Sequence, residues 1–588
     1  MPCIARTFVA RAALACAALA LPSGCGGTPA LDSQPSPQSA QEHAPWFADV
    51  TSESGIDFTH DPGPIDGRYF MPQINGSGAA LFDCNNDGRL DLYLLQFGGP
   101  DSNSRNALYL QQPSGKFQDI SPGSGLDING HNHGVAVADV NNDGWQDVLV
   151  TQYLGARLFL NQTDNTFRDV TGELELTNPY WGASAGFADF DRDGWLDLAI
   201  VNYIEFDESR YCTARGGKRD YCLPSIFEAE STRLWRNRGA DSAGPWQGYE
   251  DVTAASGLAA KPGPGMGVLC ADLSGDGWPD LFVANDLEPN HLWINQRDGT
   301  FQEEAVTRGL AYNARGLAQS DMGAALGDVD GDLLPDVFVT HFTDEHHGLW
   351  KQRAAGLFQE ETIAAGLSNS AWHGTAWGTT LTDFDQDGWL DVALVNGFVQ
   401  RRDAPSGTFW QDYMDRNQLF ASEGQGRFRD VSLSNPALCG GPNVGRGLCA
   451  GDLDGDGAID LVVTQIGGPV RILRNVAPNR GHWLLVRAVD PALQRDAIGA
   501  EIVLAAGGRR WLGLVQPGQG FQCAHDPRVH FGLGAADRID SIEVRWPDGS
   551  RERFAGGPAD RALELRRGEG SPSAENHGPA HGSPEPVE

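Results

Sequence analysis

The sequence predicts an all-β protein: a seven-bladed β-propeller closed by its N-terminal strand and followed by a small C-terminal β domain. An Asp-rich nonapeptide occurs seven times, with starts 56, 50, 83, 56, 55 and 69 residues apart. Small residues precede each copy, and a short apolar run typical of a strand follows it. An aromatic-led element follows each of the first six copies, and a seventh such element, Phe47–Thr51, precedes the first copy instead. The N-terminal strand can therefore complete the last blade and leave the ring without an open edge.

The charge of the chain excludes two classes of function. Its 588 residues include 43 Lys and Arg against 78 Asp and Glu, a formal net charge of −35. Such a polyanion repels nucleic acids and anionic membrane surfaces, and it attracts cations. A hydrophobic content of 40% is sufficient for a large core, so most of the chain is expected to be globular.

The first 45 residues have the composition of an export segment. Arg6 and Arg11 accompany the apolar run 12–21, which predicts a secretory signal over 1–25. Cleavage after Ala20 and lipid attachment at Cys25 both remain open. Residues 26–45 predict a flexible tether, and no later run reaches the roughly 18 apolar residues of a membrane span. We therefore expect an exported protein, extracellular or lipid-anchored to the bacterial cell envelope.

The nonapeptides, within the predicted propeller 46–476, predict Ca²⁺ sites. Oxygen-bearing side chains at positions 1, 3, 5 and 9, the backbone carbonyl of position 7 and a turn at the glycine of position 6 form a cage of hard ligands. Four carboxylates this close would repel each other without a cation. The predicted metal ligands are Asp83, Asn85, Asp87, Arg89 and Asp91; Asp139, Asn141, Asp143, Trp145 and Asp147; Asp189, Asp191, Asp193, Trp195 and Asp197; Asp272, Ser274, Asp276, Trp278 and Asp280; Asp328, Asp330, Asp332, Leu334 and Asp336; Asp383, Asp385, Asp387, Trp389 and Asp391; Asp452, Asp454, Asp456, Ala458 and Asp460.

The seven loops are not expected to be equivalent, and they are not EF-hands. Position 12 holds Leu, Val or Ile in every copy, where an EF-hand needs a bidentate Glu. Loops one, two and four have Asn or Ser at position 3 and thus three carboxylates. Loop five has Leu333 where the others have Gly, and a non-Gly residue in a left-handed turn costs about 1–2 kcal/mol. We expect up to seven structural Ca²⁺ ions, with loop five the weakest site.

These repeats resemble those of FG-GAP/VCBS proteins, the group that includes integrin α-subunit propellers and proteins of the cartilage acidic protein type. The resemblance implies that the loops bind Ca²⁺ structurally at the blade edge, that the loop aspartates are ligands rather than catalytic groups, and that partners engage other surfaces.

Residues 477–567 predict the second domain. Strands are expected at 482–489, 498–504 and 539–546 from their apolar alternation. Three segments, 496–500, 529–534 and 546–549, resemble the ASPIC/UnbV domain, although Cys523 departs from the expected polar residue. The composition of 568–588 predicts a disordered tail.

Cysteine spacing predicts two local disulfides. Cys212 and Cys222 are ten residues apart, as are Cys439 and Cys449, although sequence does not fix the connectivity. Residues Cys84, Cys270 and Cys523 are expected to be buried free thiols.

The function that the sequence favours is a scaffold for adhesion or for binding an extracellular protein or glycan, as a monomeric propeller without nucleic-acid partners. The basic insertion 203–233, with Arg210, Arg215, Lys218 and Arg219, is the preferred partner-specific loop.

Two alternatives remain. The first is a secreted polysaccharide hydrolase or lyase. For the histidine clusters a solvated loop is favoured, because no nucleophile or ligand spacing accompanies them. The candidate residues for such an enzyme are His131, His133, Asp286, Glu288, His341, Glu345, His346 and His347. No catalytic residue is assigned. The second is a carbohydrate-binding module that uses the loop tryptophans at position 7, for which packing between blades is the preferred interpretation.

Overall fold

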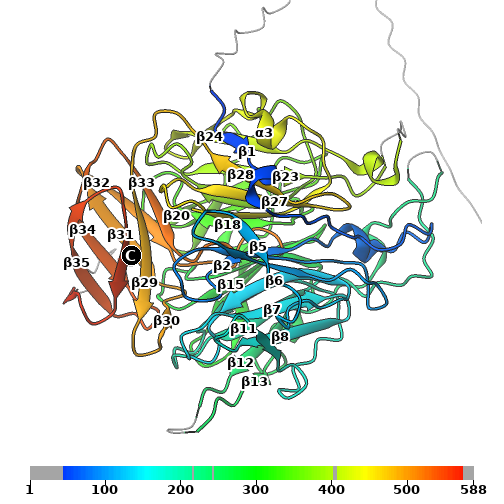
Figure 1. Cartoon of the computed structure of the whole chain (residues 1–588), viewed down its shortest axis with the longest axis horizontal. Helices are drawn as coiled ribbons and strands as arrows, with labels where there is room; N and C mark the ends of the chain where they lie inside the picture. The colour runs from blue at the N-terminus through cyan, green and yellow to red at the C-terminus, as the bar shows by residue number, and fades with distance from the viewer. Residues whose placement is uncertain (1–43, 215–216, 241–243, 402–406, 574–588) are drawn as a thin grey trace, which may run out of the picture. The chain divides into compact units, whose positions relative to one another are not determined.

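The computed structural model describes residues 44–214, 217–240, 244–401 and 407–573. The predicted secretory signal and residues 26–43 of the tether lie outside them. Seven four-stranded antiparallel sheets and a separate pair of C-terminal sheets make up the described chain (Figure 1). The predicted fold class is confirmed.

Six blades consist of four consecutive strands. From the innermost strand outwards they are β2 (Ala79–Phe82), β3 (Asp91–Leu94), β4 (Ala107–Gln111) and β5 (Phe117–Asp119); β6 (Asn132–Ala138), β7 (Asp147–Gln152), β8 (Gly155–Asn161) and β9 (Phe167–Asp169); β10 (Gly182–Ala188), β11 (Asp197–Asn202), β12 (Arg233–Asn237) and β13 (Tyr249–Asp251); β14 (Gly265–Ala271), β15 (Asp280–Asn285), β16 (His291–Asn295) and β17 (Phe301–Glu303); β18 (Ala324–Gly327), β19 (Asp336–Val339), β20 (Gly348–Ala354) and β21 (Leu357–Glu360); β22 (Ala376–Thr382), β23 (Asp391–Asn396), β24 (Gln418–Gly424) and β25 (Arg427–Asp430).

Blade seven takes its outermost strand from the N-terminus. It comprises β26 (Gly445–Gly451), β27 (Asp460–Gln465), β28 (Arg471–Asn475) and β1 (Phe47–Asp49). Phe47 pairs with Asn475 and Asp49 with Leu473. The inner strands of neighbouring blades contact each other in the order β2, β6, β10, β14, β18, β22 and β26, and β26 contacts β2 again. The ring is closed, as the displaced aromatic element predicts.

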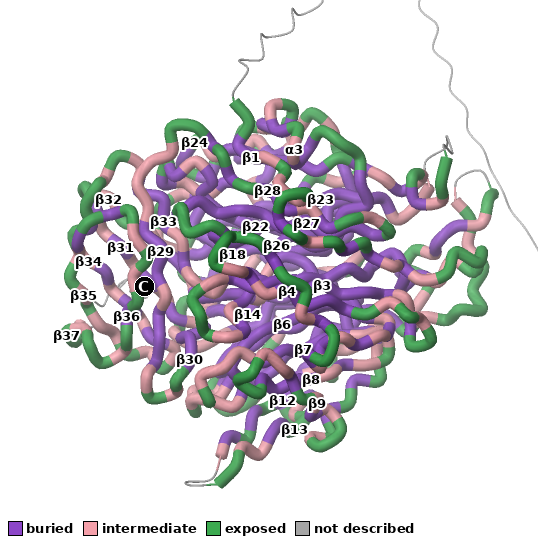
Figure 2. Tube along the Cα trace, viewed as in Figure 1, coloured by how far each residue is buried: buried purple, intermediate pink, exposed green. Residues whose placement is uncertain are grey.

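The inner strands contain small residues because the blades converge there and leave little space for side chains. All seven inner strands are buried along their whole length (Figure 2). A Cβ atom on Gly134 would lie 2.6 Å from the carbonyl oxygen of Ala183 on the next blade. Only glycine fits there, because no real Cβ approaches a neighbour so closely.

Helical segments are short and connect the strands. They are α1 (Thr51–Ser54), α2 (Ala305–Arg308) and α3 (Pro436–Cys439), and the 3₁₀ turns η1 (Met71–Ile74), η2 (Pro224–Ile226), η3 (Leu258–Ala260), η4 (Phe409–Tyr413) and η5 (Ser432–Ser434). None of the helices in the described parts of the chain is long and apolar enough to cross a membrane.

The C-terminal domain packs two sheets around its own apolar core. One sheet contains β30 (Arg495–Asp496), β29 (His482–Asp490) and β33 (Val529–Gly534), with β36 (Arg561–Arg566) parallel to β29. The other contains β32 (Arg509–Leu514), β31 (Glu501–Ala506), β34 (Arg538–Arg545), β35 (Arg551–Pro558) and β37 (Ser571–Pro572).

The tail begins later than the sequence suggests. The chain from 568 is not disordered at once, because β37 pairs with β35 and the carboxylate of Glu552 accepts the Gly568 N–H at 2.9 Å. The remainder of the predicted tail, 574–588, lies outside the described residues.

A segment of the C-terminal domain fills the centre of the propeller. This segment, residues 516–526 between β32 and β33, is called the plug. Ala524 exchanges hydrogen bonds with Ala79 and Leu81 of blade one, and Gly520 with Ala324 of blade five. Further hydrogen bonds join the plug to Val135, Ser184 and Ala450 of blades two, three and seven. The axis of the propeller is therefore occupied by protein where the plug lies.

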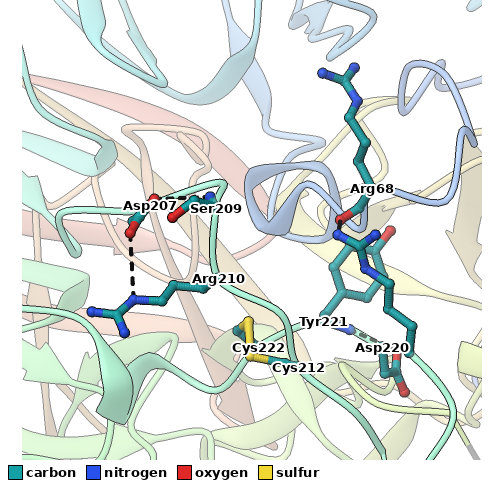
Figure 3. The surroundings of a disulfide bond; sticks show 9 residues. Arg68, Asp207, Ser209, Arg210, Cys212, Asp220, Tyr221 and Cys222 are labelled. Atoms are coloured by element: carbon teal, nitrogen blue, oxygen red, sulfur yellow. Dashed lines mark hydrogen bonds and ion pairs between the residues drawn. A yellow bond between two sulfur atoms is a disulfide. The ribbon is translucent and has the colours of Figure 1, made fainter.

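One of the two predicted disulfides is present. Cys212 and Cys222 are bonded (Figure 3). The second prediction is wrong: Cys439 and Cys449 are buried free thiols. Cys449 lies within β26, where its Sγ donates to the Ala79 carbonyl oxygen at 3.3 Å, and it packs in the same apolar cluster as Cys523 of the plug, whereas Cys439 lies on α3. The predicted free thiols Cys84, Cys270 and Cys523 are confirmed.

Candidate metal sites

The first aspartate of each nonapeptide shapes the loop. In loop one, Asp83 accepts the N–H of Asp87 at 3.0 Å and that of Gly88 at 2.7 Å. The N–H of the residue at position 6 donates to the first aspartate in all seven loops. The backbone of each turn therefore folds around the carboxylate of the first aspartate, which accepts hydrogen bonds from N–H groups of that turn.

The residue at position 9 of each loop is a buried aspartate at the start of the blade's second strand. In loop three, Asp197 accepts the N–H of Phe190 at 3.0 Å and that of Asn237 at 2.8 Å. All seven equivalents accept the same pair of amides, from loop position 2 and from the third strand. Their exposed fraction is at most 3%. Position 9 therefore joins the loop to the body of its blade.

The structure brings three carboxylates together in four of the predicted cages. The groups with donor oxygens within 4.8 Å of one another are Asp189, Asp191 and Asp197; Asp328, Asp330 and Asp332; Asp383, Asp385 and Asp391; and Asp452, Asp454 and Asp460. These are loops three, five, six and seven, which have Asp at position 3. In loops one, two and four an amide or hydroxyl oxygen stands there instead.

Asp193, Asp387 and Asp456, at position 5 of loops three, six and seven, lie outside these close groups. Each accepts the N–H of the residue at position 7 at 2.8–2.9 Å, as Asp332 does within its group in loop five, so the metal-ligand role of position 5 remains a prediction. This bond also places the residue at position 7, whose carbonyl is the predicted backbone ligand.

Burial and mutual repulsion disfavour the charged form of the loop carboxylates. Burial raises the pKa of Asp91 to about 6, of Asp139 and Asp280 to about 7, and of Asp336 to about 8. In loop six, burial and then the neighbouring Asp385 and Asp383 raise the pKa of Asp391 well above its usual range. A bound cation would reverse this repulsion.

The donor chemistry fits a hard divalent cation. Oδ1 of Asp385 and Oδ1 of Asp330, both at position 3, are buried and have no hydrogen-bond partner among the described residues. Buried polar atoms are normally satisfied, and an unpaired oxygen within a group of carboxylates is the kind of donor that a hard divalent cation takes. Ca²⁺ would be held in loop six by Asp383, Asp385 and Asp391.

Contacts between successive loops were not predicted from the sequence. Asn86 donates to the Gly144 carbonyl of the next loop at 2.8 Å, and Asn142 to that of Gly194 at 3.1 Å. Arg192 and Gln386 make the equivalent bonds to Gly277 and Gly457. All four donors occupy loop position 4 with φ between 55° and 58°. Asn86 and Asn142 are the sequence feature that could have indicated these contacts, because Asn tolerates the left-handed conformation at position 4.

Loop five differs from the others in the residue at position 6, and it also has a basic side chain close to its carboxylates. Leu333 has φ 68°, in the left-handed region that favours glycine. Nζ of the buried Lys351 lies 3.3 Å from Asp330 and 3.3 Å from Glu361, so an internal cation already lies beside this cage. The expectation that loop five binds metal most weakly remains a prediction.

The C-terminal domain rests on these loops. Arg495 donates to Asn142 Oδ1 of loop two at 2.9 Å and to the Gly194 carbonyl of loop three at 3.2 Å. Trp511 Nε1 donates to the Gly388 carbonyl of loop six at 2.9 Å, and His530 lies 2.9 Å from that of Gly457 in loop seven.

The position-7 tryptophans are partly covered. Trp145, Trp195, Trp278 and Trp389 are half-buried. The Arg192 guanidinium of the preceding loop lies 4.3 Å from the ring centre of Trp278, and that of Arg509 lies 3.6 Å from Trp389. Contacts from a neighbouring loop and from the C-terminal domain therefore cover two of the four rings.

The histidine clusters are not solvated loops, contrary to the preferred interpretation. His341, His347 and His133 are buried, whereas His346 is exposed. His341 Nε2 lies 2.7 Å from Asp321, a buried carboxylate twenty residues earlier in the chain. Glu345 is half-buried and accepts the Ser320 N–H at 2.9 Å.

The basic insertion makes internal contacts. Arg210 lies 3.5 Å from Asp207, and Arg219 donates to the Arg68 carbonyl at 2.8 Å (Figure 3). The Arg219 guanidinium also lies 4.9 Å from the Tyr211 ring. Arg215 lies outside the described residues.

Comparisons with known proteins agree with this architecture. Residues 83–150, 139–200, 272–339 and 328–394 match the FG-GAP-like repeat, and residues 490–572 match the ASPIC and UnbV family. The chain is 25% identical over 540 residues to cartilage acidic protein 1 of Xenopus tropicalis, covering 87% of this chain and 75% of the relative. It is 25% identical over 564 residues to that of Homo sapiens, covering 90% and 77%.

Among solved structures, an Agrocybe aegerita lectin with specific recognition of non-reducing terminal N-acetylglucosamine is similar, with a TM-score of 0.40, 16% identity and coverage of 71% of this chain and 96% of the lectin.

Proposed function

We propose that this chain, which carries FG-GAP-like repeats and an ASPIC and UnbV domain, is an exported, Ca²⁺-stabilised propeller scaffold that binds an extracellular partner. The observation that carries the proposal is the repeated carboxylate cage, with donor oxygens within 4.8 Å of one another in four loops. Ca²⁺ supplies charge neutralisation and a fixed coordination geometry when it is bound.

The contacts of the loop residues indicate which parts of the propeller a bound ion would stabilise. The first aspartate orders the turn, the ninth fixes the turn to its blade, and the loop-to-loop bonds at position 4 pass from one blade to the next. An ion within a cage would hold these elements together and relieve the repulsion between buried carboxylates. The role is structural, and it assigns no catalytic step to the loops.

The N-terminal composition supports export, and the likeness to cartilage acidic protein 1 supports an extracellular scaffold role. The Cys212–Cys222 bond is consistent with an oxidising compartment. The insertion that contains it stays our first choice for a partner-specific segment.

The test is thermal unfolding of the mature chain, with metal analysis, in Ca²⁺ and after metal removal. We expect several bound Ca²⁺ ions per chain and a large fall in melting temperature on removal. Asp391→Asn should lose one ion and part of the stabilisation, whereas Asp298→Asn, in an exposed loop outside the cages, should retain both. An unchanged melting temperature without bound Ca²⁺ would refute the proposal.

A further inference from the structure

A cavity of about 780 Å³ lies at the ends of the inner strands opposite the metal loops. Residues just before first strands, such as Met322 and Thr375, line it together with residues just after second strands, such as Tyr203 and Asp286. The metal loops join the other ends of these strands. The cavity is thus separate from every cage.

The plug fills the propeller axis beside this cavity. Phe521 of the plug packs on Trp377, with ring centres 5.0 Å apart, and Trp377 lines the cavity. Met71 and Met322, which also line it, belong to the same apolar cluster as Phe521. A ligand entering from this side would meet apolar lining residues that pack against the C-terminal domain.

The walls combine aromatic rings with carboxylates. Tyr203, Tyr221, Phe342 and Phe398 supply rings. The insertion joined by Cys212–Cys222 contributes Tyr221 beside the disulfide (Figure 3). Aromatic faces attract cations, most strongly where water is excluded.

Two carboxylates, those of Asp286 and Asp344, line the cavity together with the guanidinium of Arg401. Asp286 accepts the Tyr203 hydroxyl at 2.6 Å, and burial followed by the charges of Glu345 and Asp321 raises its pKa to about 7. Asp344 also lines the cavity. Within the described ranges, neither Asp286 nor Asp344 forms an ion pair with Lys or Arg.

The two arginines near the cavity already have partners. Arg401 lies 3.7 Å from Asp412 and hydrogen bonds the Tyr413 hydroxyl. Arg446 stacks on Trp377 at 4.0 Å, is fully buried, and donates to the carbonyls of Ile74, Gly397 and Gly445. Among the described residues, neither guanidinium forms an ion pair with Asp286.

An unsatisfied hydroxyl completes the site. Thr375 lines the cavity, is 0% exposed, and its Oγ1 has no hydrogen-bond partner among the described residues. Buried hydroxyls are usually paired, so this atom has unused capacity to accept a hydrogen bond.

We propose that this cavity binds an organic ammonium group, with Asp286 as its counter-ion, Thr375 as a hydrogen-bond acceptor and the aromatic walls covering its alkyl portion. The net charge of −35 favours the approach of such a cation. The ammonium group belongs either to a small amine or to a lysine side chain or N-terminus of a peptide.

Methionine methyl NMR provides the test, because the chain has five Met residues and Met71 and Met322 line the cavity. The Ca²⁺-loaded protein, labelled at the methionine methyls, is titrated with butylammonium, Nα-acetyl-lysine amide and glycinamide, and with butanol and N-acetylglucosamine as neutral probes. We expect saturable shifts at Met71 and Met322, larger than those at Met266 and Met414, with the ammonium probes only. Preference for acetyl-lysine amide or glycinamide over butylammonium would indicate a peptide side chain or N-terminus.

Asp286→Asn should weaken ammonium binding about tenfold, the effect of losing one charged hydrogen bond. Asp298→Asn is the matched control and should bind as wild type. Equal shifts with butanol, or shifts with N-acetylglucosamine alone, would overturn the proposal, as would no response to any amine. The wild-type comparison of amine with alcohol decides the question even if Asp286→Asn fails to fold.

Discussion

Arg545 of the C-terminal domain lies 2.8 Å from Oδ2 of Asp272, the first residue of the fourth metal loop. The same guanidinium pairs with Glu501 on β31. A single cation thus joins a predicted metal ligand of the propeller to a sheet of the C-terminal domain, so we expect metal binding in this loop to affect the docking of that domain.

Arg545→Met is expected to loosen the C-terminal domain. The charged hydrogen bonds that it removes are each worth about 2 kcal/mol when partly buried. Hydrogen exchange should therefore speed up in the plug before it does in the blades. Arg551→Met removes a pair with Glu543 inside the domain and serves as control. Equal exchange in both variants would disprove the coupling.

The metal-free protein should become less stable as the pH rises. The folded-state pKa values of Asp91, Asp139, Asp280 and Asp336 are raised to about 6, 7, 7 and 8, against about 3.9 unfolded. Their favourable contribution is complete below the unfolded value and is lost as the pH rises through the folded values. Calorimetry of dialysed protein from about pH 5.5 to about pH 8.5 should show a falling melting temperature.

With saturating Ca²⁺ this trend should flatten or reverse, because protons and the ion compete for the same oxygens. The same downward slope with and without Ca²⁺ would argue against metal binding in the cages.

Leu333→Gly should relieve strain in loop five. A left-handed φ costs a non-Gly residue about 1 kcal/mol, so the variant is expected to raise both stability and the Ca²⁺ affinity of this loop. Leu334→Gly, at the next position with no positive φ, should instead destabilise by a similar amount. Calorimetry and Ca²⁺ titration of the pair would check this; two variants that shift in the same direction would show that strain is not the cause.

Thiol labelling should report whether the plug is seated. Cys449 and Cys523 are buried, one on β26 and the other on the plug. Maleimide should leave both unmodified in the native protein and should modify them in Arg545→Met, located by peptide mass spectrometry. Rapid labelling of native protein would show that the plug leaves the propeller axis without any substitution.

The repeat made the propeller predictable, because every ligand of a cage lies within nine residues and the strand pattern recurs with it. The displaced aromatic element at Phe47 similarly revealed the closure of the ring. What could not be read from local sequence depends on distant contacts. Cys439 and Cys449 share the spacing of the true disulfide, yet Cys449 faces the plug, which the sequence did not reveal. The burial of His341 likewise depends on Asp321, twenty residues earlier.

The pairing of β1 with β28 has a consequence for biosynthesis. Phe47 emerges first and cannot find Asn475 until nearly the whole propeller has been translated, and the plug follows later still. Contacts of such large sequence separation make folding slow, and the outer edge of blade seven stays unprotected in the meantime. A ring of this kind reaches its final form only after chain completion, so export in an unfolded state would precede both ring closure and metal loading.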